Sequence, residues 1–294
     1  MPSLFGRTFK LTVGTLEVSD FRCKFKVEKT LKPDPNKVLI EVFNLSREHR
    51  GALAELAPGK KIKIGKKTKG QAVTKPQVGR VPVRLEVGYE LTGTEQIFFG
   101  DLRTVDSEID GPDWVTAIAS GDGERAYRTA RVNQAFGPKV PVSTALTAAV
   151  KALGLGNGNL SAVLSTLKLQ GQASLFTRGI VLSGPASRVL TDLCRSADLE
   201  WSIQDGAIQF VDFGKVLAGR SVLLKPGTGL IGSPNVSADG VCNFKSLIVP
   251  GLRCGGVVVL ESEGVKGNFR IEKLAYDGDT HGQDWTVEGW GKRY

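Results

Sequence analysis

The chain has 294 residues and a formal net charge of +9. Nine bases lie between Glu55 and Glu86, where there is no acidic residue, and the remaining 30 bases match the 30 acids. The excess charge is therefore local, which argues against a generally basic nucleic-acid-binding protein. The nine bases are Lys60, Lys61, Lys63, Lys66, Lys67, Lys69, Lys75, Arg80 and Arg84.

No stretch of the chain reaches the roughly 18 consecutive apolar residues of a membrane-spanning helix. The N-terminus lacks an apolar run of signal-peptide length, so we expect a soluble protein without a membrane segment, made without export. The four cysteines show no CxxC spacing and lie at no ligand spacing from the two histidines, so we expect free thiols, no metal site and no cofactor. They are Cys23, Cys194, Cys242 and Cys254.

The first part of the chain is predicted to consist of strands. In FRCKFKVEK, Phe21, Cys23, Phe25 and Val27 alternate with charged residues, which is typical of a strand with one buried face. Alternation continues in KVLIEVFNL, VPVRLEVGYE, QIFFGDLRTV and DWVTAIASGDG, and Pro82 favours a strand start or an edge. One short helix is expected in NLSREHRGALAELAPG, with Ser46 as its N-cap.

The middle of the chain has a different pattern. VSTALTAAVKALGLG predicts a helix that stops at Gly154, and LSAVLSTL and GPASRVLTDLCRSADLEW predict two more. The next segment predicts a hairpin around Asp205-Gly206. From about Val216 the strands return, so the sequence predicts a mainly β protein with a smaller α+β part. We expect units at 1–137, 138–215 and 216–294.

Two segments suggest an internal duplication. Asp113-Trp114 and Asp284-Trp285 each follow a strand and an acidic glycine turn, and each precedes another strand. We interpret them as two versions of one β domain, although a chance match of so short a motif would also account for them. A trimer of a duplicated chain would present six similar units to a six-fold ring.

An ordered series of segments resembles the baseplate hub proteins of phage tails, a family related to the hub of contractile-tailed phages and to phage late control protein D. The series covers about three quarters of the chain. It includes GYELTGTEQIFFGDLRTV, FTRGIVLSGPASRVLTDLCRSADLEWSIQDGAIQFV, TGLIGSPNVSADGVCNFKSLIVPGLRCGGVVVLES and GNFRIEKLAYDGDTHGQDWTVEGWG.

This resemblance implies a homotrimer in the virion baseplate, assembled in the host cytoplasm, with two tail-tube-like β-barrel domains flanking an α+β insert domain. The trimer would enclose an axial channel for tape-measure protein and for DNA in transit. One face would join the tail tube protein and the other a trimeric spike or tail-tip protein. The resemblance places Leu230, Ile231 and Pro234 at the start of the second barrel, and Trp114 and Trp285 are expected to be structural.

The lysine-rich segment, about residues 60–84, allows several interpretations. It can be a solvated loop, a contact with an acidic patch on a neighbouring tail subunit, a DNA-binding element or a contact with lipid headgroups. Stacking aromatics are missing from Lys60 to Arg80, which disfavours single-stranded nucleic acid. An insert around 66–80 departs from the family pattern, so the resemblance does not assign this loop a role.

Catalysis has little support in the sequence. There is no G-x-S-x-G elbow, and neither histidine has a context that places it beside a nucleophile. The acidic group around His281, with Asp277, Asp279, Asp284 and Glu288, resembles a metal or acid/base cluster, but a solvated turn between two strands explains it more simply and is predicted here. We therefore expect a structural protein rather than an enzyme. The alternatives are a β-rich nucleic-acid-binding protein that uses the lysine-rich loop, and a tail-tip cell-wall hydrolase.

Overall fold

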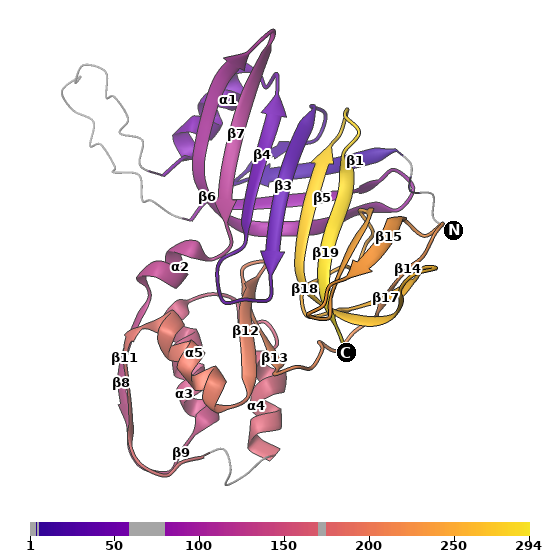
Figure 1. Cartoon of the computed structure of the whole chain (residues 1–294). Coiled ribbons are helices and arrows are strands. Elements are labelled where there is room, and N and C mark those ends of the chain that lie inside the picture. The colour runs from indigo at the N-terminus through magenta and orange to yellow at the C-terminus, as the bar shows by residue number, and fades with distance from the viewer. Residues whose placement is uncertain (1–3, 5, 59–79, 170–174) are drawn as a thin grey trace, which may run out of the picture.

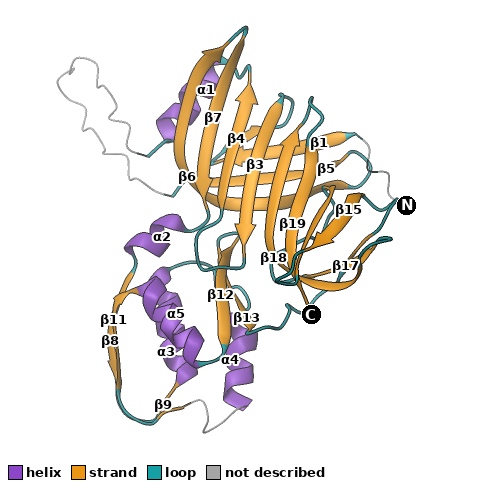
Figure 2. Ribbon diagram, viewed as in Figure 1, coloured by secondary structure: helices purple, strands orange, loops and turns teal. Residues whose placement is uncertain are grey.

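The computed structural model describes residues 4, 6–58, 80–169 and 175–294. Strands form both ends of the chain and most of the helices lie between them, as the ribbon shows (Figure 2). The predicted mainly β architecture with an α+β part is confirmed.

The described residues of the N-terminal β unit form seven strands and one helix. Ser46 caps the helix through its hydroxyl, which accepts a hydrogen bond from the His49 N–H at 3.1 Å, and β5 begins at Pro82, both as predicted. The elements are β1 (Arg7–Val13), β2 (Leu16–Val18), β3 (Cys23–Thr30), β4 (Lys37–Phe43), α1 (Arg47–Leu56), β5 (Pro82–Tyr89), β6 (Gly93–Asp110) and β7 (Asp113–Gly121).

The α+β unit contains the predicted helices and the predicted hairpin. Gly154 ends α3 with φ +64°, and Asp205 and Gly206 both have positive φ in the hairpin turn. Helix α2 was not predicted from the sequence. The elements are α2 (Glu124–Thr129), β8 (Arg131–Phe136), β9 (Val140–Pro141), α3 (Val142–Leu153), α4 (Leu160–Leu169), β10 (Leu175–Phe176), β11 (Ile180–Pro185), α5 (Ala186–Ser196), β12 (Leu199–Gln204) and β13 (Ala207–Asp212).

The C-terminal β unit consists of six strands. Its first short strand pairs in parallel with β17, and its other pairings are antiparallel. The strands are β14 (Val222–Leu224), β15 (Leu230–Val236), β16 (Val241–Leu247), β17 (Val257–Glu261), β18 (Lys266–Asp279) and β19 (Trp285–Arg293).

The two β units share one sheet and one core. Strand β3 pairs with β18 over seven residues, from Thr30 opposite Lys273 to Lys24 opposite Asp279. The main path of the sheet runs β15-β16-β19-β18-β3-β4-β7-β6-β5-β1-β2 (Figure 1). Buried side chains of both β units form one hydrophobic cluster, and the α+β unit has a second cluster of its own below the sheet.

The β units have the same strand order. In the N-terminal unit the order is β3-β4-β7-β6-β5, and in the C-terminal unit it is β15-β16-β19-β18-β17. Five strands of each unit thus share one order, in which the fifth along the chain pairs with the second; the additional strands differ, since β1 pairs antiparallel with β5 whereas β14 pairs in parallel with β17. The duplication predicted from the two Asp-Trp segments is therefore present in the strand order.

One strand irregularity also corresponds, whereas the register shifts of the β5–β6 and β15–β16 ladders have no counterpart in the other unit. In the N-terminal unit, a bulge interrupts the β6–β7 ladder, and pairing resumes at Thr104, opposite the fifth residue after Trp114. In the C-terminal unit, a bulge interrupts the β18–β19 ladder, and pairing resumes at Lys273, opposite the fifth residue after Trp285. Because a bulge re-aims the strand that carries it, each long strand changes direction at the equivalent position.

Candidate functional site

Most of the predicted basic loop lies outside the described residues. This applies to Lys60, Lys61, Lys63, Lys66, Lys67, Lys69 and Lys75. Arg80 is described: its Nε lies 3.9 Å from the Asp101 carboxylate, and its Nη1 donates to the Gly154 carbonyl at 3.5 Å. These exposed contacts attach Arg80 loosely to β6 and to the end of α3.

The two tryptophans of the repeated motif have different environments. Trp285 is fully buried and packs edge-on against Phe25, with ring centroids 5.4 Å apart. Trp114 remains 39% exposed, and the Arg50 guanidinium stacks 3.8 Å from its ring centroid. The sequence motif therefore repeats, while only its second copy contributes to the core.

The predicted strand at the start of the second barrel lies at one end of the sheet. Pro234 is buried, whereas Ile231 is 38% exposed and Leu230 is half-buried. The β15–β16 register shifts between Ile231 and Asn235, so this strand has a bulge that contains Pro234.

An apolar groove begins at this strand. Its volume is about 630 Å³, and its wall includes the exposed side chains of Leu223 and Ile231. The lining residues also include Leu4, Thr92, Leu230, Leu247, Val249 and Pro250. Apolar grooves of this kind commonly receive an apolar side chain of a partner.

A polar joint connects the two β units where β3 meets β18. Arg22 binds the Asp279 carboxylate at two points, Nη2 to Oδ2 at 2.7 Å and Nε to Oδ1 at 3.2 Å. Arg7 donates to the carbonyls of Asp279 at 2.9 Å, Gly282 at 2.6 Å and Gln283 at 3.1 Å. Two arginines of the N-terminal unit thus hold the β18–β19 turn of the C-terminal unit.

The environment of Asp279 keeps this carboxylate ionised. Burial alone would raise its pKa, but hydrogen bonds from Arg22 and from the N–H groups of His281 and Gly282 lower the pKa to about 2. The prediction of a solvated acidic turn is therefore wrong for Asp279, which is 3% exposed. The buried carboxylate is stabilised by Arg22, which is partly exposed and lies far away in the sequence.

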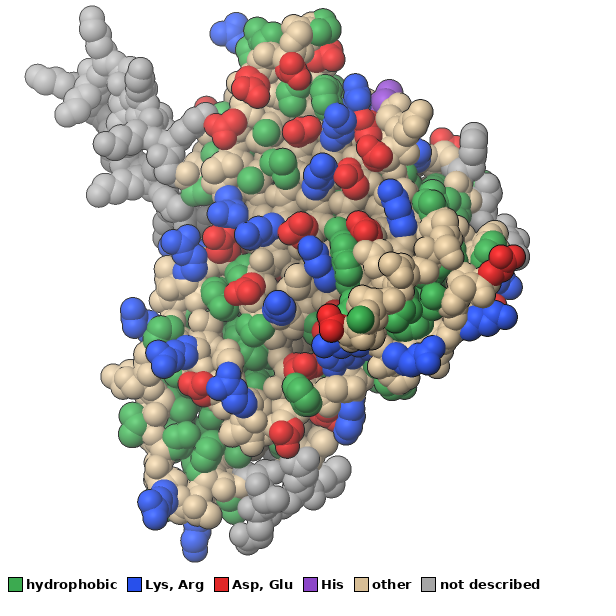
Figure 3. Space-filling view, in the orientation of Figure 1, with side chains coloured by type: hydrophobic (Ala, Val, Ile, Leu, Met, Phe, Trp, Pro, Cys, Tyr) green, Lys and Arg blue, Asp and Glu red, His purple; other side chains and the backbone are tan. Residues whose placement is uncertain are grey.

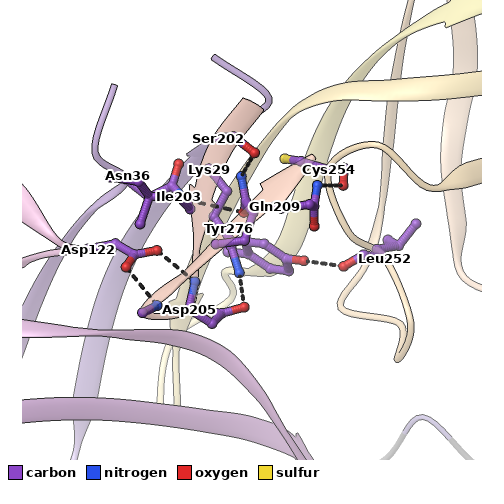
Figure 4. A network of polar contacts seen from close by, with 12 residues as sticks. Lys29, Asn36, Asp122, Ser202, Ile203, Asp205, Gln209, Leu252, Cys254 and Tyr276 are labelled. Atoms are coloured by element: carbon purple, nitrogen blue, oxygen red, sulfur yellow. Dashed lines mark hydrogen bonds and ion pairs between the residues drawn. The ribbon is translucent and has the colours of Figure 1, made fainter. Parts of the chain in front are cut away.

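A second joint attaches the α+β unit to the sheet through the β12–β13 turn (Figure 4). Lys29, nearly buried on β3, lies 2.7 Å from the Asp205 carboxylate. Asp122, fully buried, accepts hydrogen bonds from the N–H groups of Asp205 at 2.6 Å and Gly206 at 2.8 Å. Burial raises the pKa of Asp122 to about 7, in spite of the hydrogen bond from the Gly206 N–H, which lowers it.

Further contacts strengthen this attachment. The Asn36 amide donates to the Ile203 carbonyl at 2.7 Å, and Gln204 donates to the Thr30 carbonyl at 2.7 Å. The buried Arg270 guanidinium of β18 pairs with Glu200 of β12 at 2.7 Å. The α+β unit therefore contacts both β units through hydrogen-bonded polar groups.

The face of the sheet that spans both β units carries charges of both signs. Lysines and acidic residues are interspersed over β3, β4, β18 and β19 (Figure 3). Across the β3–β18 junction, Lys26 lies 3.6 Å from Asp277 and Lys273 lies 3.9 Å from Glu28. A surface of mixed sign attracts polyanions less than a uniformly basic surface does.

The described side chains offer no obvious chemistry for catalysis. All four cysteines are buried free thiols. Burial raises the pKa of Cys194 and Cys254 to about 12, and it raises the pKa of Cys23 and Cys242 as well, which makes these thiols poor nucleophiles. Within the described ranges, no group of three or more histidine, cysteine or acidic side chains has a metal-binding arrangement. None of the described helices has the length and hydrophobicity to cross a membrane.

Sequence reasoning did not find the residues of the two joints. Arg7, Arg22, Lys29, Asp122 and Arg270 belong to no motif, and each contacts a partner far away in the chain. The one usable signal was the charge of Lys29, at a position where the β3 alternation predicts a buried side chain.

The fold is that of phage tail proteins and related secretion-system proteins. A 43 kDa tail protein of prophage MuSo2 from Shewanella oneidensis has a TM-score of 0.61 at 10% identity, with 98% of each chain covered. A tail protein from Neisseria meningitidis has a TM-score of 0.62 at 7% identity, with 98% of this chain and 97% of that chain covered.

A third solved structure comes from an Escherichia coli protein that is a component of the type VI secretion system. That protein is described as similar in structure to the T4 bacteriophage tail proteins gp27 and gp5. It has a TM-score of 0.55 at 10% identity, with 97% of this chain and 76% of that chain covered.

The model of the Baseplate hub gp41 family matches residues 8–291, and the chain belongs to this family. Among curated proteins, no sequence matches the chain. The predicted relationship to phage tail baseplate hubs is therefore confirmed.

Proposed function

We propose that this baseplate hub protein is a homotrimer that joins the six-fold tail tube to a trimeric spike or tail-tip protein. The trimer encloses an axial channel through which tape-measure protein and DNA pass. Its role is structural, in the virion baseplate, and it assembles in the host cytoplasm. We keep the boundaries 1–137, 138–215 and 216–294 as a proposed division into two tube-like β-barrel domains and an α+β domain, although α2 and β8, which precede residue 138, pack with the α+β elements.

The shared strand order of the two β units carries this proposal. A chain with two equivalent units, side by side in one sheet, supplies two of six positions around a ring. Three copies then match a six-fold tube without a symmetry mismatch, and their own three-fold axis matches a trimeric spike. The mixed charges on the shared face suit a channel wall, because DNA in transit must not bind tightly.

The mass and shape of the assembly test this function. We expect light scattering to give three times the chain mass of 31.5 kDa, and electron images to show a ring with six similar lobes. Labelling of the protein in tail particles should place it at the spike end of the tube. A protein that is absent from the tails, and monomeric at all concentrations, would contradict the proposal.

The nucleic-acid alternative depends on the lysine-rich segment. Deletion of residues 66–79 should leave the trimer mass unchanged if the segment is peripheral to the hub. Loss of oligonucleotide retention with a steep salt dependence, in a monomeric protein, would instead favour nucleic-acid binding. A blank peptidoglycan zymogram would argue against the hydrolase alternative.

A further inference from the structure

The contact between the two β units of one chain provides a template for a contact between chains. Strand β3 pairs on one side with β4 and on the other with the second half of β18, residues 273–279. The β18–β19 turn then covers the start of β3: the Thr280 N–H donates to the Cys23 carbonyl at 3.0 Å, and the Cys23 N–H donates to the Thr280 hydroxyl at 3.0 Å.

The internal repeat identifies which strands of the other β unit are equivalent to β3 and to the second half of β18. Strand β15 corresponds to β3, and residues 104–110 of β6 correspond to residues 273–279 of β18. Within the part of the chain that the structure describes, β15 pairs only with β16, and residues 104–110 pair only with β7. Both edges that the template would join are therefore open in a single copy.

Apolar side chains are exposed at both open edges. Ile109, near the tip of the β6–β7 hairpin, is 63% exposed, and Ile231 and Val236 on β15 are 38% and 42% exposed. The apolar groove lies at the start of β15, where the template places a hairpin turn. Exposed isoleucine on a projecting hairpin and an apolar groove are complementary surfaces.

The large and the small side chain of the β3–β18 contact change places at the equivalent positions of β15 and β6. In the template, Phe25 on β3 lies over Gly278 on β18, which has no Cβ to obstruct the ring. In the equivalent contact between two copies, the smaller Pro234 takes the position of Phe25, and the larger Ile109 takes the position of Gly278. The large and small partners have changed places, so the combined volume at the joint is kept.

Pro234 limits backbone hydrogen bonding in the contact between β15 and a second copy. Proline has no N–H, so a continuous ladder along the open edge of β15 lacks one donor. The bulge shortens the ladder further. Apolar side chains must therefore supply most of the stabilisation, in contrast to the Arg22–Asp279 ion pair of the template.

From these observations we infer that the β6–β7 hairpin of one copy docks on β15 and the apolar groove of the next copy. The contact is head to tail, so it closes into a ring when the rotation between neighbouring units is one sixth of a full turn and involves no shift along the axis. The occupant is a second copy of this chain, because the template contact within the chain specifies both surfaces. This inference rests on the proposed homotrimer and identifies its interface.

Disulfide trapping tests the predicted register. Asp277 lies opposite Lys26 in the template, so Glu108 of one copy should lie opposite Asn235 of the next. The double variant Glu108→Cys/Asn235→Cys should form covalent trimers on mild oxidation, since the four native thiols are buried. A matched control is Val181→Cys/Asn235→Cys, because Val181 is also exposed, at 67%, but lies on the α+β unit. The control should stay uncrosslinked.

A charge at the tip of the hairpin tests the apolar contact. Ile109→Lys should weaken trimer formation by about tenfold or more, whereas Val181→Lys should leave it unchanged. Both positions are exposed, so at protein concentrations too low for trimer formation both variants should unfold at the same temperature as the unmodified protein. That measurement separates lost docking from lost folding.

The outcomes distinguish this inference from the proposed function. A trimer by light scattering that gives no Glu108–Asn235 crosslink, and tolerates Ile109→Lys, would overturn the interface and leave the hub role standing. A monomer without crosslinks at the highest soluble concentration would also count against the interface. Absence of the protein from tail particles would contradict the hub role itself.

Discussion

The guanidinium of Arg22 holds the carboxylate of Asp279 at two points, although 257 positions separate them in the chain. The pair lies where the N-terminal and C-terminal β units meet, at the end of the β3–β18 ladder. Because Asp279 is 3% exposed, its charge depends on Arg22 and on nearby N–H groups for stabilisation. The ion pair of a buried carboxylate with a partly exposed guanidinium therefore adds to the β3–β18 ladder in holding the two β units together.

Asp279→Asn should destabilise the protein at pH 7 by about 2 kcal/mol, since a lowered carboxyl pKa stabilises the folded state. The pKa of Asp279 is about 2 in the folded protein and near its usual 3.8 in the unfolded chain. The stabilisation is therefore present above pH 4 and is lost as the pH falls toward 2. Urea unfolding at pH 7 and at low pH measures it.

Asp277→Asn is the matched control, because Asp277 lies on the same strand with a 47% exposed side chain. An exposed ion pair contributes little to stability, so the free energy of unfolding should change by no more than about 0.5 kcal/mol. Equal losses of unfolding free energy in Asp279→Asn and Asp277→Asn would show that the Arg22–Asp279 pair stabilises the fold no more than an exposed pair does.

Asp122 should give the opposite dependence on pH. Its pKa is raised to about 7 when folded, so between pH 4 and pH 7 the folded protein binds more protons at this carboxyl than the unfolded chain does. Its contribution to stability is greatest below pH 4 and falls as the pH rises through 7. Denaturation midpoints measured from pH 5 to pH 8 should therefore decline with pH.

Asp122→Asn removes this titration, so the variant's midpoint should change less across the same range. Its stability at pH 5 should be lower than that of the unmodified protein, because an amide has one acceptor oxygen for the two N–H groups of Asp205 and Gly206. Parallel pH profiles for the two proteins would show that Asp122 does not titrate in this range.

The two tryptophans of the repeated motif should differ in their contribution to stability. Trp285→Ala should cost about 3–5 kcal/mol, because it leaves a cavity beside Phe25 in the shared core. Trp114→Ala should cost less than about 1 kcal/mol, roughly the value of an exposed stacking contact with Arg50. Thermal unfolding of both variants checks the difference, and a reversed order would contradict it.

Two glycine substitutions should have opposite signs. Gly278→Ala places a methyl group against the Phe25 ring, and such overpacking typically costs about 1–3 kcal/mol. Gly51→Ala lies in α1, where the added Cβ meets no neighbour within 4 Å, so helix propensity should stabilise the protein by up to about 1 kcal/mol. Chemical denaturation of each variant gives the sign directly.

Local patterns predicted the secondary structure well because their causes are local. Alternating side chains identified the strands, Ser46 supplied an N-cap through its hydroxyl, and Gly154 supplied the left-handed conformation that ends a helix. The Asp205-Gly206 turn was also predicted correctly, since few residues other than asparagine, aspartate and glycine adopt positive φ readily. The short helix α2 was missed, as it has six residues and no side-chain cap.

The sequence by itself determined where most strands, helices and turns lie, because these depend on neighbouring residues. The two Asp-Trp segments only suggested that a β unit recurs, and the strand order showed it. Only the tertiary structure decided that β3 pairs with β18, that Asp279 is buried beside Arg22, and that Trp285 lies in the core while Trp114 does not. The reason is that a sheet edge has the same backbone hydrogen-bonding groups along its whole length. The partner and the register are therefore selected by side chains that come from distant parts of the chain.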